Sequence, residues 1–360
     1  MAPLEGCHVI DLSLLLPGPL ATQILRDLGA RVTKVEPPAP GDYMAYWPPM
    51  AGDVSATYAT INRGKEILTL NLKEPTDRER FYELVRTADV VLEGFRPGVI
   101  DKLQIGYAKL SEINPRIVLC SISGYGQTGP YAQRAGHDLN YQALAGVLSI
   151  AGGNAATTPN PQLQVADTAA GSYAAAMLIL AALLERHKTN RGRHIDVSMS
   201  EQLLPLMATL FAAADALGSN PQRDGELLSG GAPCYRIFRT SDDHHITVGA
   251  LEPKFWVSVC ERLRLPEMAT ARFHGCPDVD NIESRLAEVF ATKTRAEWIE
   301  IFGDSDSCVE PVLSFAEVRE LSQWQARRSF LALKTPAGVT LRVPKMPASL
   351  AGFDTEEGPA

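Results

Sequence analysis

Residues 8–36 read HVIDLSLLLPGPLATQILRDLGARVTKVE, which predicts a strand, a helix and a second strand. The first run, HVIDL, is apolar and short, as expected for a buried parallel strand. Gly18 and Pro19 stand at the start of the next segment and Gly29 at its end, the usual order of these residues around a helix. RVTKVE then has the composition of another strand. This unit is typical of α/β domains with a parallel sheet.

The same alternation continues through the first third of the chain. Residues 67–72 (ILTLNL) predict a strand and residues 76–85 a helix, and DVVLEGF and IVLCSISGYG predict two further strands. We therefore expect a large, Rossmann-like doubly wound domain. Ligands bind outside the carboxyl ends of the strands in such sheets, where the loops LLLPGP, GFRPG and SGYGQTGPY lie. No G-x-G-x-x-G joins the first strand to its helix, so a dinucleotide role has weak support.

Two polar segments interrupt the rest of the chain. Residues 151–164 (AGGNAATTPNPQLQ) precede the strongest helix pattern, of which Asp167 is the expected N-cap. Residues 218–233 (GSNPQRDGELLSGGAP) precede two predicted strands, CYRIFRT and HHITVGA. We expect a large domain over 1–200, a linker over 201–224, a smaller α+β domain over 225–330, and a return of 331–360 to the first domain.

Capping boxes mark two helices of the smaller domain. Thr294 is followed three residues later by Glu297, and Ser314 by Glu317. In this pattern the hydroxyl and the carboxylate each bind a backbone N–H at the helix start. Both segments are therefore predicted to begin helices.

Bulk composition excludes several classes of protein. The net charge of −8 and a pI near 5.5 argue against a general nucleic-acid binder, although a local basic pocket for an anionic ligand is compatible with them. The N-terminus has no signal-peptide pattern, and the apolar run 173–184 is too short to span a bilayer. The six cysteines form no C-x-x-C pair, which favours reduced thiols in a cytoplasmic protein over a zinc site or a disulfide framework. They are Cys7, Cys120, Cys234, Cys260, Cys276 and Cys308.

Three residues form a candidate acid/base set. Taken singly, His137 and Asp167 fit helix caps and Glu252 fits a turn. Each also stands where a strand or loop meets a helix, a common position for catalytic groups. Asp167 and the amides after it would supply a base and an oxyanion donor, His137 would face that carboxylate across a substrate, and Glu252 would orient the imidazole.

Basic residues beside glycines form a second candidate set. Arg63 and Lys65 lie in NRGK, and Arg96 and Lys102 lie in or after FRPG. A neighbouring glycine allows a phosphate to approach closely, so these loops are candidates for binding a nucleotide tail. The alternative is ordinary solvated surface charge.

These stretches together resemble the family III CoA-transferases (the CaiB–BaiF superfamily), and within them the α-methylacyl-CoA racemases. The resemblance covers nearly the whole chain, and GHDLNY and GALEPKF are its most racemase-like parts. It implies an interlocked homodimer that acts on 2-methyl-branched acyl-CoA thioesters through an enolate, with no cofactor besides the CoA of the substrate. His137 and Asp167 match the acid/base pair, and Glu252 matches the carboxylate that reaches the histidine from the other subunit.

The resemblance also implies a CoA-binding set around the GFRPG loop and the start of GHDLNY. We expect it to comprise Arg63, Lys65, Leu92, Glu93, Gly94, Phe95, Arg96, Pro97, Gly98, Lys102, Gly136, Asp138 and Tyr141. The chain is expected to depart from the racemases in a longer segment at 42–61, in Pro37 where they often have an arginine, in TAAGS after Asp167, and in lacking the family's usual closing helix.

Two alternatives stay open. A family III CoA-transferase would use Asp167 as a nucleophile that carries the acyl group, and would not require His137 or Glu252. A CoA-thioester-binding protein without catalysis would have kept the fold of the family and lost its chemistry. Proton exchange at the α-carbon would support the racemase, acyl exchange that needs a second carboxylic acid would support the transferase, and thioester binding without proton exchange would support the non-catalytic protein.

Overall fold

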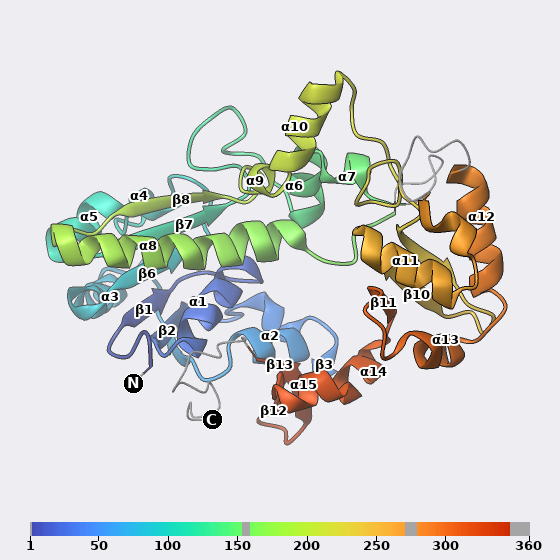
Figure 1. Cartoon of the computed structure of the whole chain (residues 1–360). Helices are drawn as coiled ribbons and strands as arrows, with labels where there is room; N and C mark the ends of the chain where they lie inside the picture. The colour runs from blue at the N-terminus through green and yellow to red at the C-terminus, as the bar shows by residue number, and fades with distance from the viewer. Residues whose placement is uncertain (1, 153–158, 271–278, 346–360) are drawn as a thin grey trace. The chain divides into compact units, whose positions relative to one another are not determined.

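The computed structural model describes residues 2–152, 159–270 and 279–345, which leaves Cys276 and the end of the chain outside. The chain divides into two compact units, one of residues 1–147, 161–208 and 322–360 and the other of residues 148–160 and 209–321. The segment expected as a linker, 201–224, contains α9 (Leu203–Leu206) and α10 (Ala208–Leu217) (Figure 1).

A parallel sheet forms the centre of the first unit. Within the described residues it has six strands in the order β5-β2-β1-β6-β7-β8, and every pairing is parallel. The strand order reverses between β1 and β6, which confirms the predicted doubly wound fold. The strands are β1 (His8–Asp11), β2 (Arg31–Glu36), β5 (Glu66–Thr69), β6 (Val90–Glu93), β7 (Val118–Ser123) and β8 (His194–Ser198), the last of which was not predicted.

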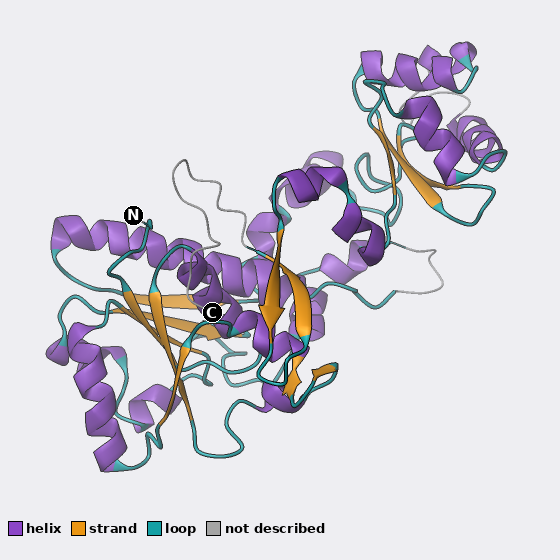
Figure 2. Cartoon of the chain, turned by 90° about the horizontal axis from the view of Figure 1, so that it is seen from below, coloured by secondary structure: helices purple, strands orange, loops and turns teal. Residues whose placement is uncertain are grey.

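Helices cover both faces of this sheet (Figure 2). Successive strand residues point to opposite faces, so Val9 and Val90 pack in one cluster while Ile10 and Val91 pack in another. The first cluster includes α1 (Pro17–Asp27), the π-helix η2 (Ala166–Tyr173) and α8 (Ala174–Thr189), and the second includes α3 (Pro75–Thr87), α4 (Val99–Lys102) and α5 (Tyr107–Ile113).

η2 and α8 form one continuous helix, Ala166–Thr189. In the described part of the chain it alone is long and apolar enough to cross a membrane, by length and composition, and half of its most apolar window is buried. Its contacts with β7, β8 and α1 make it a cover of the sheet. It begins one residue before Asp167, with Val165 as the N-cap, so the prediction that Asp167 is the N-cap is wrong.

Shorter elements complete the first unit. The segment after β2 folds as η1 (Tyr43–Tyr46), the β3–β4 hairpin (Met50–Ala51 and Val54–Ser55) and α2 (Ala56–Ile61). Farther along are α6 (Asp138–Leu144), α7 (Val147–Ile150) at the boundary between units, α15 (Ser322–Ala326) and the hairpin of β12 (Phe330–Lys334) and β13 (Thr340–Pro344).

The second unit is built on a small antiparallel sheet. β9 (Tyr235–Arg239) and β10 (His245–Gly249) are the two predicted strands, and β11 (Val309–Pro311) pairs with β10. Trp256, Phe290 and Trp298 are fully or almost fully buried in its core. Both predicted capping boxes are confirmed at α13 (Arg295–Phe302) and α14 (Phe315–Glu320). Around this sheet are also α11 (Pro253–Arg262), η3 (Pro266–Thr270) and α12 (Val279–Phe290).

Candidate active site

A cavity of about 520 Å³ opens at the carboxyl ends of the parallel strands. It is lined by residues at the ends of three strands, namely Ser13–Leu15 after β1, Gly94–Pro97 after β6, and Ser123 and Gly124 at the end of β7. These loops meet where the strand order reverses, the usual ligand position in doubly wound sheets. His137 and Asp167 also line this cavity, so the fold brings together two residues that are 30 positions apart.

His137 is placed by the start of α6, of which it is the N-cap. Its backbone N–H donates to Asn140 Oδ1 at 3.1 Å. On its other side, the Tyr141 hydroxyl donates to the carbonyl of Gly136 at 2.5 Å. A Cβ at Gly136 would lie 2.7 Å from the Tyr125 hydroxyl and 2.8 Å from the Tyr141 ring, so only glycine lets the chain pass this close to the two tyrosines.

Asp167 lies in the first turn of η2 and is partly buried. Burial, and then the neighbouring Asp138 carboxylate, raise the pKa of Asp167 to about 7. An isolated aspartate titrates near 3.9. Asp167 is therefore held where both its protonated and its ionised forms are populated near neutral pH.

The amides around Asp167 are already occupied. Asp138 Oδ1 accepts the N–H of Ala166 at 2.8 Å and the N–H of Asp167 at 3.1 Å, and Thr168 N–H donates to Gln164 O at 2.9 Å. These three amides are therefore not free to stabilise an oxyanion. Asp138 was expected to contact CoA, but its buried side chain turns to η2 and is not part of the cavity wall.

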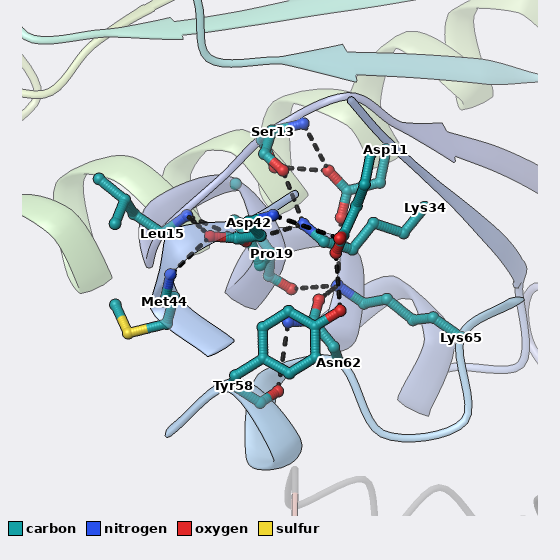
Figure 3. Close-up of polar contacts among 12 residues, drawn as sticks. Asp11, Ser13, Leu15, Pro19, Lys34, Asp42, Met44, Tyr58, Asn62 and Lys65 are labelled. Atoms are coloured by element: carbon teal, nitrogen blue, oxygen red, sulfur yellow. Dashed lines mark hydrogen bonds and ion pairs between the residues drawn. The ribbon is translucent and has the colours of Figure 1, made fainter. Parts of the chain in front are cut away.

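The loop after β1 is held by a buried charged cluster (Figure 3). Asp42 accepts the N–H of Leu15 and that of Met44, and it pairs with Lys34 at 3.2 Å. Lys34 Nζ also donates to Ser13 O at 2.7 Å. Leu15 has a φ of +66°, a left-handed conformation that is unfavourable for leucine. The cluster thus fixes the cavity wall in a shape that the loop would not adopt alone.

Lys65 belongs to the same cluster and not to the cavity. Its ammonium is fully buried and lies 3.1 Å from Asp11 Oδ2, with further bonds to Pro19 O, Thr22 Oγ1 and Asn62 Oδ1. Burial raises the pKa of Asp11, but the ammoniums of Lys65 and Lys34 outweigh it and bring that pKa to about 2. Because the ammonium already donates hydrogen bonds to these groups inside the protein, the expectation that Lys65 binds a phosphate is wrong.

The structure separates the other expected CoA residues into two groups. Gly94, Phe95, Arg96, Pro97, Gly136 and Tyr141 line the cavity. Arg63 instead pairs with Asp27 and donates to Thr60 O. Outside the cavity wall lie Leu92, Glu93, Gly98 and Lys102, of which Leu92 and Glu93 are buried in β6.

Glu93 supports the loop that carries Arg96. Its carboxylate accepts the N–H of Phe95 at 2.6 Å. Burial raises the pKa of Glu93 to about 7 although hydrogen bonds from Ser121 and Phe95 lower it. Its role here is structural support from beneath the loop.

Glu252 lies in the second unit as the exposed N-cap of α11. Its carbonyl accepts the N–H groups of Phe255 and Trp256, both at 3.1 Å. The expected partnership between Glu252 and His137 stays a prediction.

The cavity wall also contains residues that the sequence did not single out. Arg134 is exposed three residues before His137, and its guanidinium lies 3.6 Å from the centre of the Tyr131 ring. Tyr43 reaches the cavity from η1 and packs edge-on against Trp47 at 5.4 Å. An arginine so close to a candidate base was a usable signal, whereas nothing local distinguishes Tyr43.

A second, apolar cavity of about 140 Å³ adjoins the first, because Leu14 and Phe95 line both. Pro37, which stands where the racemases often have an arginine, contributes to the wall of this second cavity. Lys73 is an exposed cation on the same wall.

Comparisons with known proteins identify close relatives. The model of the family described as CoA-transferase family III matches residues 4–359. The chain is 36% identical to human alpha-methylacyl-CoA racemase over 98% of its own length and 92% of the relative's, and 35% identical to acetyl-CoA:oxalate CoA-transferase of Acetobacter aceti over 98% and 90%. A CAIB/BAIF family protein from Brucella suis has a similar structure, with a TM-score of 0.83, 28% identity, and coverage of 98% of this chain and 94% of the other.

Proposed function

The chain belongs to CoA-transferase family III, and we propose that within this family of enzymes it is a racemase that inverts the α-carbon of 2-methyl-branched acyl-CoA thioesters. The observation that carries the proposal is that His137 and Asp167 line one cavity while the pKa of Asp167 is raised to about 7. A carboxyl group with that pKa can both take and return a proton near neutrality. An ordinary aspartate is almost fully ionised there.

The proposed reaction moves only protons. In one direction the Asp167 carboxylate takes the α-proton, and the electron pair of the C–H bond moves to the thioester oxygen to form an enolate. The imidazolium of His137 then gives a proton to the opposite face of the α-carbon. In the reverse direction the two residues exchange roles, so the chemistry requires no metal or redox cofactor.

The enolate oxygen needs hydrogen-bond donors as its charge develops. The amides at the start of η2 are occupied by Asp138 and Gln164. The N–H groups of Asp138 and Leu139, directly after His137, form no hydrogen bond with another described residue. We assign the enolate oxygen to these two amides, which places it on the same side of the cavity as the imidazole.

The CoA tail is proposed to extend from this cavity into the smaller apolar one. Arg96 and Arg134 are exposed cations on the first wall, suited to phosphate oxygens. The smaller cavity is apolar enough for a planar ring and carries Lys73 at its edge. In this arrangement Lys73 supplies a positive charge on a wall where Pro37 supplies none.

We further propose that the enzyme is a cytoplasmic homodimer in which Glu252 of the other subunit approaches His137. Large apolar side chains are exposed on two helices, as expected for surfaces that a second subunit covers. α10 has no buried residue, with Phe211 49% and Leu217 71% exposed. On α8, Met177 is 60% and Leu184 66% exposed.

CoA transfer is the second candidate function. The observation that favours it is the oxalate CoA-transferase relative, whose 35% identity is almost that of the racemase. There Asp167 would attack the thioester carbonyl, form an acyl anhydride and release CoA thiolate. That reaction needs an ionised Asp167 and an acceptor acid.

The deciding experiment incubates one (2R)-2-methylacyl-CoA epimer with the enzyme in deuterium oxide. Racemisation gives both epimers and deuterium at the α-carbon, and Asp167→Asn and His137→Ala should each lose roughly 10²- to 10⁴-fold in rate. Glu112→Gln is the matched control, because Glu112 is exposed and pairs with Lys109 on the surface. Acyl exchange that requires a carboxylic acid, without deuterium uptake, would establish the transferase. Binding of the thioester with neither outcome would establish a non-catalytic protein.

A further inference from the structure

The Asp138 side chain connects the two elements that carry the candidate acid/base pair. Its Oδ1 accepts the N–H of Ala166 at 2.8 Å and that of Asp167 at 3.1 Å. Its Oδ2 accepts from Gln142 Nε2 at 2.6 Å. The residue is 6% exposed and directly follows His137, so one buried carboxylate fixes the backbone of Asp167 to the helix that begins beside the imidazole.

We propose that Asp138 is a positioning residue that sets the place and the protonation of Asp167 relative to His137. This inference rests on the proposed function, because it concerns the same proton-transfer pair. Asp138 caps η2, which lies 28 residues farther along the chain. At the start of its own helix it is Asn140, not Asp138, that accepts the N–H of His137.

By accepting the amides at the start of η2, Asp138 also changes the electrostatic environment of Asp167. Free amides at a helix start stabilise a carboxylate, and would favour an ionised Asp167. Asp138 takes those amides and adds a negative charge of its own. Burial first, and Asp138 second, raise the pKa of Asp167. The result is a helix start that favours the protonated form of its own first-turn aspartate.

Other titratable or charged groups also face this cavity and contribute to its pH response. They come from η1, from the loops after β6 and β7, and from α6, and they are Tyr43, Arg96, Arg134, His137 and Tyr141. Tyr125 packs against the Tyr141 ring beside them. Tyr141 has a pKa raised by burial and then by Asp167, so it is neutral over the useful range. None of these groups donates to or accepts from the η2 amides in the described structure, which leaves Asp138 as the group to vary.

The test compares Asp138→Asn with Asp138→Ala. Asparagine keeps an oxygen for both amides but removes the charge, and the Gln142 amide can rotate to accept its new N–H. In the direction in which Asp167 is the base, the acidic limb of the kcat/KM profile should therefore move to lower pH by roughly one pH unit. In the reverse direction, in which Asp167 is the acid, the basic limb should move to lower pH instead, and the thermal midpoint should change little. Alanine removes the hydrogen bonds too, so kcat of Asp138→Ala should be about 100-fold lower than that of Asp138→Asn. Glu112→Gln, which changes the net charge equally, should leave the profile unmoved.

A readout without substrate separates this proposal from the proposed function. The infrared difference between each protein and its Asp167→Asn counterpart reports the protonated carboxyl of Asp167. Its midpoint should lie near pH 7 with Asp138 present and lower in the Asp138→Asn background. An unchanged midpoint, or a pH profile unmoved in a folded Asp138→Asn variant, would overturn the role of Asp138. A shifted midpoint in an enzyme without α-proton exchange would support Asp138 and refute the racemase.

Discussion

The carboxylate of Asp42 accepts the backbone N–H of Leu15 across 27 residues of sequence, with both oxygens 3.2 Å from the nitrogen. The contact joins the segment after β2 to the loop after β1. Because that loop lines the cavity with Asp167, Asp42 shapes the cavity without belonging to its wall.

Asp42→Ala is expected to destabilise the fold and weaken substrate binding together. It leaves the fully buried Lys34 ammonium without its carboxylate, and breaking a buried pair costs about 3–5 kcal/mol. Chemical denaturation should show that loss in the free energy of unfolding, and KM for the thioester should rise. Asp53→Ala, an exposed position in the same segment, should change neither. A fully stable Asp42→Ala enzyme would contradict the role of this pair.

Glu93 predicts a pH dependence of stability. Burial raises its folded pKa from 4.5 to about 7, so the native state binds the proton more tightly than the unfolded chain does. The favourable contribution is complete below about pH 4.5 and is lost as the pH rises to 7, by up to about 3 kcal/mol. The groups that share this environment include Asp101 and Asp196.

The measurement for Glu93 is the free energy of unfolding of the wild type and of Glu93→Gln between pH 4.5 and 8. The wild type should lose stability relative to the variant, which keeps a neutral hydrogen-bonding group. Glu112→Gln controls for a general effect of net charge. Parallel curves for the wild type and Glu93→Gln would show that Glu93 titrates normally.

Arg96 and Lys65 should behave in opposite ways. Arg96 is exposed on the cavity wall, so Arg96→Ala should raise KM for the thioester with little change in the thermal midpoint. Lys65→Ala leaves Asp11 buried without its closest ammonium, so it should lower the unfolding free energy by about 3–5 kcal/mol. Steady-state kinetics and denaturation on both variants check the contrast. A stable Lys65→Ala enzyme with a raised KM would restore the phosphate-binding interpretation.

Mixed dimers test the proposed sharing of the site. If His137 and Glu252 of different subunits act together, a dimer of one His137→Ala and one Glu252→Gln chain contains one intact site and one doubly altered site. Random mixing then gives about a quarter of the wild-type activity, whereas each variant alone is nearly inactive. The mixture should be measured after subunit exchange against unmixed controls. No recovery, with exchange verified by mass, would place both residues of a site in one chain.

The sequence alone supplied much of the fold, because its elements depend on local pattern. The strands around residues 8–12 and 31–36, the helix between them and both capping boxes were all predicted. The sixth strand, β8, was not predicted: HIDVS carries charged residues among apolar ones at an exposed edge of the sheet. The predicted start of η2 was wrong because aspartate is a common N-cap in sequence. The carboxylate that accepts the N–H of Asp167 comes instead from Asp138, 29 residues earlier.

For the site residues too, the sequence determined some features and the tertiary structure determined others. The sequence by itself determined which groups stand at helix starts and strand ends, since caps, glycines and apolar periods act over a few residues. Only the tertiary structure decided that His137 faces the cavity while Asp138, the next residue, turns inward to Asp167. Likewise it decided that Lys65 closes a buried ion pair while Arg96 stays exposed. Burial and partner charges come from distant segments packed together, and these set whether a side chain binds, titrates or supports the fold.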